Sequence, residues 1–339
     1  MTTFSISFAA PLALASLALI STAPSGQTPA APPPRPGVKA AGVKIPIDKL
    51  KPEAVYEIGG NPDWLAIDDA AWVSNKPKDS VSRLDPKSNA VATIQLGENK
   101  HPCSGLSAGF DSLWVPNCGD QTISRVNLKT REISATFKNS IGNTEGSIVT
   151  GAGSVWIVTD AKGTLARIDP ATQKTVAEIY VPSGSYGLAF GEGAVWVTST
   201  DHDSVTRVDP DTNLIVETIA VGKKPRFITA GEGAVWALNQ GDGSVSRIDP
   251  KSNKVAATIE VGVPGPGGDI SAGEGSVWVT SFEFPLSRID PATNTVVQQF
   301  YGKGGDALRV GLGWVWLSNL EAGTVWRIDP RRVRATLPE

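Results

Sequence analysis

The sequence predicts an all-β protein, a seven-bladed β-propeller built of four-stranded antiparallel blades. Two repeated phrases carry this prediction: a tryptophan phrase such as GEGAVWV (191–197) and an arginine phrase such as SRIDP. The tryptophans recur at intervals of 42, 42, 40, 40, 42 and 38 residues, and one arginine follows each of them. A repeat of about 40 residues made of short strands is typical of propellers. The two series are Trp72, Trp114, Trp156, Trp196, Trp236, Trp278 and Trp316, and Arg83, Arg125, Arg167, Arg207, Arg247, Arg288 and Arg327.

Each repeat divides into four short strands. Residues 225–262 read as the strands PRFITAG, AVWALN, SVSRID and KVAATIEVG, separated by GEG, QGDG and PKSN. The runs are rich in Val, Ile, Thr and Trp, and turn-forming residues separate them. The glycines of GEG suit the positive φ angles of a tight hairpin, and a strand rather than a helix follows, unlike in a dinucleotide-binding loop. No long 3.6-residue apolar period follows residue 45, so we expect almost no helix.

The repeated residues are interpreted as structural. One tryptophan per blade can fill the gap to the neighbouring blade, in preference to forming an aromatic ligand cage. We expect most of the arginines to pair with acidic groups near the rim. In DPKSN and DPATN, proline presets φ and Asp or Asn can bond its own backbone, which predicts a tight hairpin.

A ring of blades must join its two ends. The segment AVYEIGG (54–60) resembles a fourth strand with no blade before it, so we expect the N-terminal strand 54–60 to complete the seventh blade. That closure would leave no open sheet edge at the seam. The alternative is that RVRATLP (332–338) fills this position.

The N-terminal segment differs from the rest. Residues 1–24 contain the apolar run 8–21 and predict a signal peptide, and residues 25–45 predict a disordered Pro/Ala-rich linker. An uncleaved anchor is the alternative, although 14 apolar residues are short for a membrane span. Residues 46–339 are then a single propeller domain, periplasmic or secreted, monomeric, and without a membrane span in the mature chain.

Charge bears on the class of partner, and cysteine usage bears on the compartment. The net charge is −3 and no basic block occurs, which argues against a nucleic-acid partner. Cys103 and Cys118 lie symmetrically about the hairpin turn at 110–111, so we expect them to face each other. A disulfide there fits an oxidising compartment, and two buried free thiols are the alternative.

The candidate site is the mouth of the central channel, where the residues just before each inner strand converge. We expect a small-molecule or protein ligand there, bound by non-repeated side chains. The ligand-binding candidates are Asp63, Trp64, Glu145, Tyr186, Arg226, Asp269 and Asp306, with Ser104 and Phe227 at equivalent positions.

Metal binding or catalysis at this mouth is the second interpretation. Four carboxylates, Asp63, Glu145, Asp269 and Asp306, could hold Mg²⁺ or Ca²⁺ through oxygen ligands. Crowded carboxylates also raise one another's pKa, as a general acid requires. The catalytic candidates are Glu145, Asp269, His101 and His202, and a polar lining without chemistry is the alternative.

The pattern P-x-x-I-x-x-G-x-G-x-V-W-V-T, followed by S-V-x-R-I-D-P-x-T-N-x-V, resembles the streptogramin B (virginiamycin B) lyase-like propellers and, equally, the YVTN-repeat proteins. The resemblance covers residues 54–330. It implies a seven-bladed propeller and, for the lyases, opening of a lactone ring by elimination with a histidine, a glutamate and Mg²⁺. The family's W-F-T-E is replaced here by WVTS and WALN, and Asp63, Cys103 and Arg226 stand where its histidines would follow proline.

Two hypotheses follow. The first is an exported propeller that serves as a ligand-binding or protein-interaction module through the polar mouth of its channel. The second is a lyase-like or lactone-cleaving enzyme that uses a divalent metal in the same channel.

Overall fold

The computed structural model describes residues 1–2, 36–142 and 144–335. It divides the chain into two compact units, residues 1–34 and 35–339. The predicted signal peptide 1–24 lies outside the described residues except for its first two, as does the predicted linker up to residue 35. Every strand and helix of the described residues belongs to the second unit.

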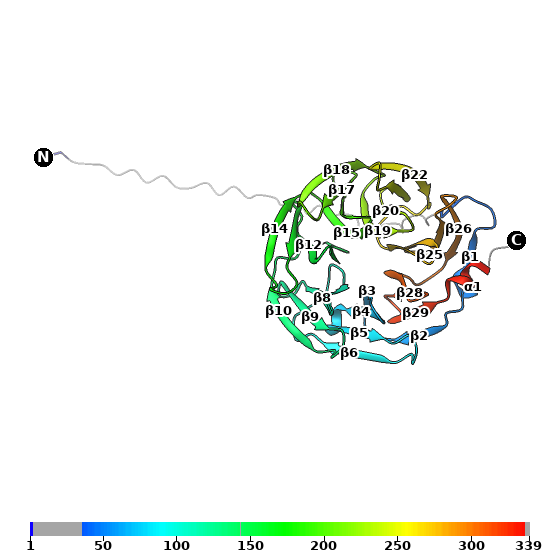
Figure 1. The fold of residues 1–339 in the computed structure, drawn as a ribbon, viewed down its shortest axis with the longest axis horizontal. Coiled ribbons are helices and arrows are strands. Elements are labelled where there is room, and N and C mark those ends of the chain that lie inside the picture. Colours follow the sequence, from blue (N-terminus) through cyan, green and yellow to red (C-terminus); the bar gives the residue numbers. More distant parts are fainter. Residues whose placement is uncertain (3–35, 143, 336–339) are drawn as a thin grey trace. The chain divides into compact units, whose positions relative to one another are not determined.

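The described residues of this unit form seven sheets around a common centre (Figure 1), which confirms the predicted propeller. Blade 1 holds β3 (Pro62–Ile67), β4 (Ala71–Asn75), β5 (Ser80–Leu84) and β6 (Val91–Gln95). Blade 2 holds β7 (Ser107–Gly109), β8 (Ser112–Asn117), β9 (Thr122–Asn127) and β10 (Ile133–Lys138). Blade 3 holds β11 (Ile148–Gly151), β12 (Ser154–Asp160), β13 (Thr164–Ile168) and β14 (Thr175–Tyr180). Blade 4 holds β15 (Ser185–Gly191), β16 (Ala194–Ser199), β17 (Ser204–Asp209) and β18 (Leu214–Ala220).

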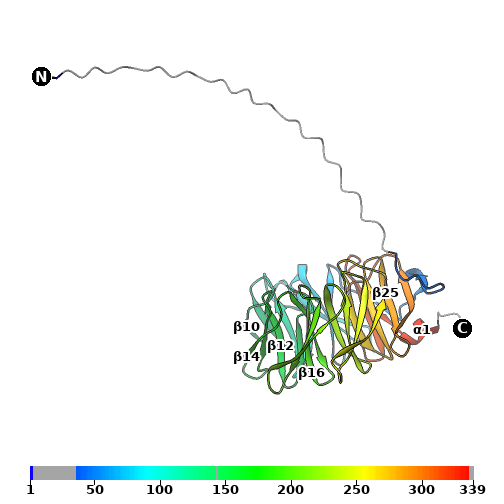
Figure 2. The ribbon, with the colours of Figure 1, turned by 90° about the horizontal axis from the view of Figure 1, so that it is seen from above.

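The last three blades complete the ring, which Figure 2 shows from the side. Blade 5 holds β19 (Pro225–Gly231), β20 (Ala234–Asn239), β21 (Ser244–Asp249) and β22 (Lys254–Glu260). Blade 6 holds β23 (Asp269–Gly273), β24 (Ser276–Ser281), β25 (Phe284–Asp290) and β26 (Thr295–Tyr301). Blade 7 holds β27 (Leu308–Gly311), β28 (Trp314–Asn319) and β29 (Thr324–Ile328), and its outer strand is β2 (Ala54–Glu57). The described residues also contain two short 3-10 helices, η1 (Ile47–Lys49) and η2 (Lys76–Lys78).

The ring is closed by the N-terminal strand, as expected. β2 pairs antiparallel with β29, from Ala54 opposite Arg327 to Glu57 opposite Thr324. The alternative, residues 332–338, is wrong, because β2 takes the position beside β29 and the described residues 330–335 form the helix α1 (Pro330–Ala335). The Asp329 carboxylate accepts the Arg331 backbone N–H at 2.8 Å ahead of Pro330, a combination that favours a helix start.

A strand that the sequence analysis did not predict lies just before the propeller. β1 (Lys44–Pro46) adds parallel to the outer strand β26, so blade 6 has five strands. Val38, within the segment predicted as linker, is 5% exposed, and its N–H donates to the Gln299 side-chain oxygen at 2.8 Å. Residues 36–46 therefore pack against blade 6 because Val38 and the strand N–H groups find partners there.

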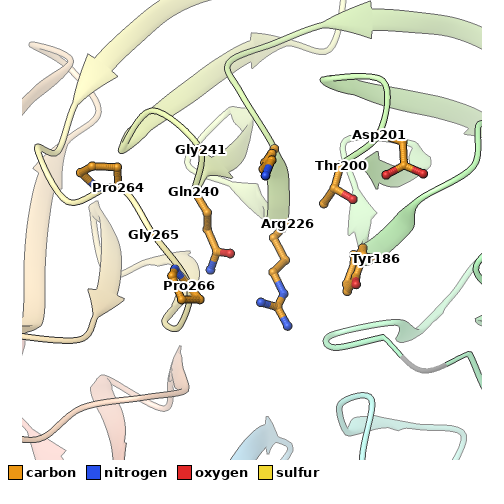
Figure 3. Close-up of a pocket in the computed structure, with 10 residues that line it drawn as sticks. Tyr186, Thr200, Asp201, Arg226, Gln240, Gly241, Pro264, Gly265 and Pro266 are labelled. Carbon is orange, nitrogen blue, oxygen red and sulfur yellow. The ribbon is translucent and has the colours of Figure 1, made fainter. Parts of the chain in front are cut away.

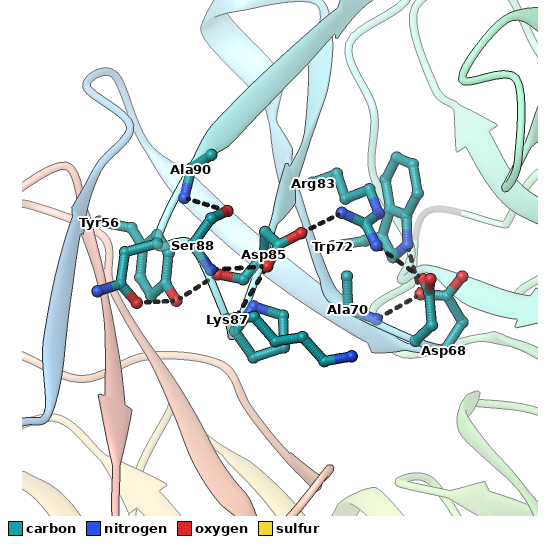
Figure 4. A network of polar contacts seen from close by, with 12 residues as sticks. Tyr56, Asp68, Ala70, Trp72, Arg83, Asp85, Lys87, Ser88 and Ala90 are labelled. Atoms are coloured by element: carbon teal, nitrogen blue, oxygen red, sulfur yellow. Dashed lines mark hydrogen bonds and ion pairs between the residues drawn. The ribbon is translucent and has the colours of Figure 1, made fainter.

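The repeated tryptophans are buried between the blades, which confirms their structural role. All seven have 0% exposure. In blades 2 to 7 each indole N–H donates to the carbonyl of the glycine five residues earlier, at 3.0 to 3.3 Å. In blade 1 the Asp68 carboxylate replaces this carbonyl and accepts the Trp72 N–H at 2.8 Å (Figure 4). The indole hydrogen bond thus fixes the first hairpin of every blade.

The prediction that most repeated arginines pair with acids is wrong. Arg167 lies over the Trp156 ring at 5.1 Å and donates to the Pro210 carbonyl of the next blade at 2.6 Å. The same link to the next blade's Asp-Pro turn is made by Arg125, Arg207, Arg247 and Arg327. The turn aspartate Asp169 accepts two backbone N–H groups of its own turn. Arginine therefore joins neighbouring blades through carbonyl groups.

Arg83 and Arg288 make other contacts. Arg288 donates to the Ser276 hydroxyl at 2.8 Å and to the Gln298 side-chain oxygen at 3.2 Å, both within blade 6. For Arg83 the sequence explains the difference. In blade 2 the Asp-Pro pair is replaced by Asn127 and Leu128. Arg83 instead pairs with Asp69 at 3.0 Å and with Asp85 at 3.2 Å (Figure 4). This arginine keeps its contacts within blade 1.

Cys103 and Cys118 form the predicted disulfide, with their Cα atoms 5.8 Å apart across the β7–β8 hairpin. Backbone hydrogen bonds hold both ends, from the Cys103 N–H to the Pro116 carbonyl and from the Cys118 N–H to that of His101. Among the described residues, no helix is long and apolar enough to cross a membrane.

Candidate functional site at the channel mouth

The central channel is lined by the inner strands of the blades. A cavity of about 260 Å³ inside it is bounded mainly by apolar side chains of β3, β7, β11, β15, β19, β23 and β27. Arg309 is the charged residue of that lining. At the position equivalent to Arg309 the other blades have Ala66, Ser107, Val149, Ala189, Thr229 and Ser271. The sequence analysis did not predict Arg309 as a channel residue. The signal was present in the sequence, because Arg309 is the charged residue among these seven equivalent positions.

A second cavity of about 260 Å³ forms the mouth of the channel at one end. Five of the seven predicted ligand-binding residues line it: Asp63, Trp64, Glu145, Arg226 and Asp306. The lining also contains Phe227, Phe282, Leu320, Ala307 and the segment 266–268. Residues from five blades or their links thus meet here, either beside an inner strand or in the loop after a second strand.

Arg226 organises one wall of this mouth. Its guanidinium makes an ion pair with Glu145 and lies over the rings of Tyr186 at 5.2 Å and Phe227 at 5.4 Å. Phe227 in turn packs on Trp64, with ring centroids 5.8 Å apart. A guanidinium stacked on two rings has few accessible orientations, so its charge is held in place at the mouth.

The segment that carries Glu145 is held by Ser104, at the equivalent position one blade earlier. Ser104 is buried, and its hydroxyl donates to the Thr144 carbonyl at 2.7 Å and also contacts the Gly142 carbonyl at 3.1 Å. Ser104 therefore positions the glutamate rather than lining the mouth.

Asp63 and Asp306 form a hydrogen-bonded carboxyl pair across the junction of blades 1 and 7. Burial raises the pKa of Asp306 to about 7, with the negative charges of Asp269 and Glu145 adding to the effect. Burial, and then the charges of Asp306 and Glu145, raise the pKa of Asp63 well above its ordinary value. Two carboxyl groups in this position share a proton, because their joint ionisation would place like charges together.

Asp269 is brought near the mouth, but its carboxylate turns inward. It is 3% exposed, accepts the backbone N–H groups of Ile270 and Leu308, and pairs with Arg309 at 2.5 Å. Burial raises the pKa of Asp269, and the Arg309 guanidinium opposes that rise. Asp269 therefore links blades 6 and 7 beneath the mouth and does not line the mouth cavity.

No group of three or more His, Cys, Asp and Glu side chains in the described part of the chain is arranged to hold a metal ion. Of the four predicted metal ligands, Asp63 and Asp306 are paired with each other, Glu145 with Arg226, and Asp269 with Arg309. Binding of Mg²⁺ or Ca²⁺ by these residues stays a prediction.

The two histidines are not part of the mouth lining. The His101 ring lies 3.3 Å from the Asp79 carboxylate, in the link between blades 1 and 2. His202, in the β16–β17 loop, has its Nε2 3.2 Å from the Ser183 hydroxyl. Different blades and different partners thus separate the two proposed proton carriers.

A larger groove of about 620 Å³ adjoins the mouth between blades 4 and 5 (Figure 3). It shares Arg226 and Pro266 with the mouth cavity. Its other lining residues are Tyr186, Thr200, Asp201, Lys224, Gln240, Gly241, Pro264 and Gly265. The link 261–268, which carries both prolines, has eight residues between β22 and β23, whereas the link between β18 and β19 has four. The longer link between β22 and β23 could have predicted that these residues form a wall between the groove and the mouth.

No protein-family model and no curated protein sequence matches the chain. Among solved structures, it is similar to a streptogramin B lyase structure, with a TM-score of 0.69 and 16% identity over 81% of this chain and 96% of that chain. It is also similar to virginiamycin B lyase from Staphylococcus aureus. The selenomethionine form has a TM-score of 0.70 and 17% identity, over 81% of this chain and 98% of that one. A catalytically inactive histidine-to-alanine variant with quinupristin has a TM-score of 0.69 and 16% identity, over 81% and 99%. The chain therefore shares the seven-bladed propeller fold of virginiamycin B lyase.

Proposed function

We propose that this chain is an exported β-propeller that binds a ligand at the polar mouth of its central channel. The observation that carries the proposal is the fixed charge arrangement at this mouth. Arg226 lies over two rings and pairs with Glu145, and the Asp63–Asp306 pair lines the same cavity of about 260 Å³. Few convergent polar groups in a concave, partly aromatic cavity are typical of ligand sites.

The chemistry of the mouth favours a ligand with both a hydrogen-bond donor and an acceptor. A carboxyl pair that shares one proton offers an O–H donor beside carboxylate acceptors. The rings of Trp64, Phe227 and Phe282 give the same cavity apolar walls. An amide or hydroxyl group attached to an apolar body matches this combination, whether it belongs to a small molecule or to a side chain of a protein partner.

Export is supported by the Cys103–Cys118 disulfide, because such bonds persist in oxidising compartments. Expression with the native N-terminus in a bacterial host, followed by fractionation and intact-mass measurement, tests this proposal. We expect a periplasmic or secreted form cleaved near residue 24. A full-length product in the cytoplasm would contradict it.

The binding proposal is tested by a thermal-shift screen of lactones, cyclic peptides and amides. A ligand of the mouth should raise the Tm of the wild type and of an Asp111→Asn control on the exposed β7–β8 hairpin. It should not raise the Tm of Asp306→Asn or of Trp64→Phe to the same extent. Compounds that stabilise all four proteins equally would place binding elsewhere.

A second candidate function is a lyase-like or lactone-cleaving enzyme. The pKa of Asp306, raised to about 7 by burial, is the specific observation that favours it, because a general acid or base works best near the ambient pH. Incubation with quinupristin, with and without Mg²⁺ and EDTA, followed by mass spectrometry of the products, tests this candidate. Ring opening that Asp306→Asn abolishes and Asp111→Asn preserves would support it, and an unchanged substrate would refute it.

A further inference from the structure

The groove between blades 4 and 5 contains two charged side chains of opposite sign that are not paired with each other. Within the described residues, the Lys224 ammonium and the Asp201 carboxylate make no hydrogen bond or ion pair with protein groups, although both line this groove. The neighbouring Lys223 differs, because its ammonium pairs with Asp203 at 2.7 Å. Lys224 and Asp201 are therefore available to a ligand.

The rest of the groove is held in place by its own hydrogen bonds. The Lys224 backbone N–H donates to Asp203 at 2.8 Å, and the Thr200 hydroxyl donates to the Gly184 carbonyl at 3.1 Å. The Gln240 amide donates to the Gly267 carbonyl at 2.8 Å. These hydrogen bonds hold the groove wall in place, and the charges of Lys224 and Asp201 are left to interact with a bound molecule.

The rest of the groove lining combines polar side chains with a tyrosine ring and two prolines. Figure 3 shows Arg226 between Tyr186, Thr200 and Asp201 on one side and Gln240 and the prolines on the other. The Tyr186 ring is covered by the Arg226 guanidinium, which keeps this wall in one orientation. A volume of about 620 Å³ lies within the range of sites for drug-sized molecules and exceeds the mouth cavity.

We propose that this groove is a binding site for a zwitterionic, short peptide-like molecule with a free carboxylate and a free ammonium group. The carboxylate binds the Lys224 ammonium and the ligand's ammonium binds the Asp201 carboxylate. The apolar part of the ligand packs against Pro264 and Pro266. This site goes beyond the mouth, since neither Lys224 nor Asp201 lines the mouth cavity.

Isothermal titration calorimetry with three probes tests the proposal: the tripeptide Ala-Phe-Ala with both ends free, its N-acetyl form and its C-terminal amide. We expect the free tripeptide to bind most tightly. Blocking either end removes one charge pair and should weaken binding about fivefold, the scale of a partly exposed ion pair. Equal binding of the three probes, or binding of none, would overturn the proposal.

Matched variants locate the site. Lys224→Met should weaken the free tripeptide and leave the C-terminal amide unaffected, whereas Lys223→Met should change neither. Asp201→Asn should weaken the free tripeptide and leave the N-acetyl form unaffected, with Asp211→Asn, on an exposed turn of the same blade, as its control. An equal effect of Lys223→Met would refute this site. The mouth proposal is tested separately by Asp306→Asn, so the two can fail independently.

Discussion

The buried Asp306 carboxyl should make the protein less stable as the pH rises, and replacing Asp306 by asparagine should remove this effect. The pKa of this carboxyl is raised by burial from its ordinary value of 3.8 to about 7. Between these two pH values the folded protein keeps a proton that the unfolded chain has lost. The contribution of Asp306 to the free energy of unfolding is therefore highest near pH 4 and falls as the pH rises to 7.

The magnitude follows from the same values. A rise from 3.8 to about 7, at 1.36 kcal/mol for each pH unit, corresponds to about 4 kcal/mol as an upper limit. Asparagine carries no such proton, and its neighbour Asp63 also loses an adjacent negative charge. Relative to the wild type, Asp306→Asn should therefore gain stability progressively as the pH rises from 4 to 7.5.

Urea unfolding followed by tryptophan fluorescence at half-unit intervals from pH 4 to 8 measures this difference. Asp111→Asn provides the control, because that aspartate is exposed and its substitution should leave the profile of the wild type unchanged. A wild-type minus variant difference that is flat over this range would show that the carboxyl pair holds no shared proton, and the reasoning about the mouth would fail.

Three further predictions concern the scaffold. Arg167→Met removes the hydrogen bonds of Arg167 to the next blade and its contact with an indole ring. Urea unfolding should therefore show a loss of about 2–4 kcal/mol in the free energy of unfolding. A loss below about 0.5 kcal/mol would contradict the role of arginine between blades. Replacing Cys103 and Cys118 by serine opens a loop of 15 residues and should lower the free energy of unfolding by about 3 kcal/mol in the same assay. An unchanged urea midpoint would refute that stabilisation. Arg309→Met leaves Asp269 buried without its partner and should lower the free energy of unfolding by about 3–5 kcal/mol at pH 7. Much of this loss should be recovered at pH 4, because Asp269 is protonated more easily there. A loss independent of pH would contradict this interpretation of the pair.

The sequence was sufficient for the features that repetition controls. The spacing of the tryptophans set the blade count, and the unpaired segment at 54–60 set the closure. The position of the two cysteines about one hairpin turn set the disulfide. The blade count, the ring closure and the disulfide each depend on a local sequence pattern or on a strand register that recurs in all seven blades.

Features that depend on contacts across the ring were missed. Nothing local connects Val38 to Gln299, 261 residues away, so the strand at 44–46 was counted as linker. The repeated arginines were assigned acidic partners because the carbonyl that accepts from Arg167 belongs to a turn 43 residues further along.

The candidate site shows the same division. The positions before the inner strands correctly located five residues of the mouth, because these positions share one end of the ring. The direction of the Asp269 side chain could not be read in this way, since its partner Arg309 lies on another blade. The tryptophans and arginines of the repeat make scaffold contacts, so our binding proposal rests on the non-repeated side chains at this end.

A crystal structure of the protein with the strongest stabilising compound from the thermal-shift screen tests this division most directly. The account predicts that the compound lies in the mouth, in contact with the Asp63–Asp306 pair and beside the Arg226 guanidinium. A compound bound to the outer strands of the blades, or at the opposite end of the channel, would contradict it.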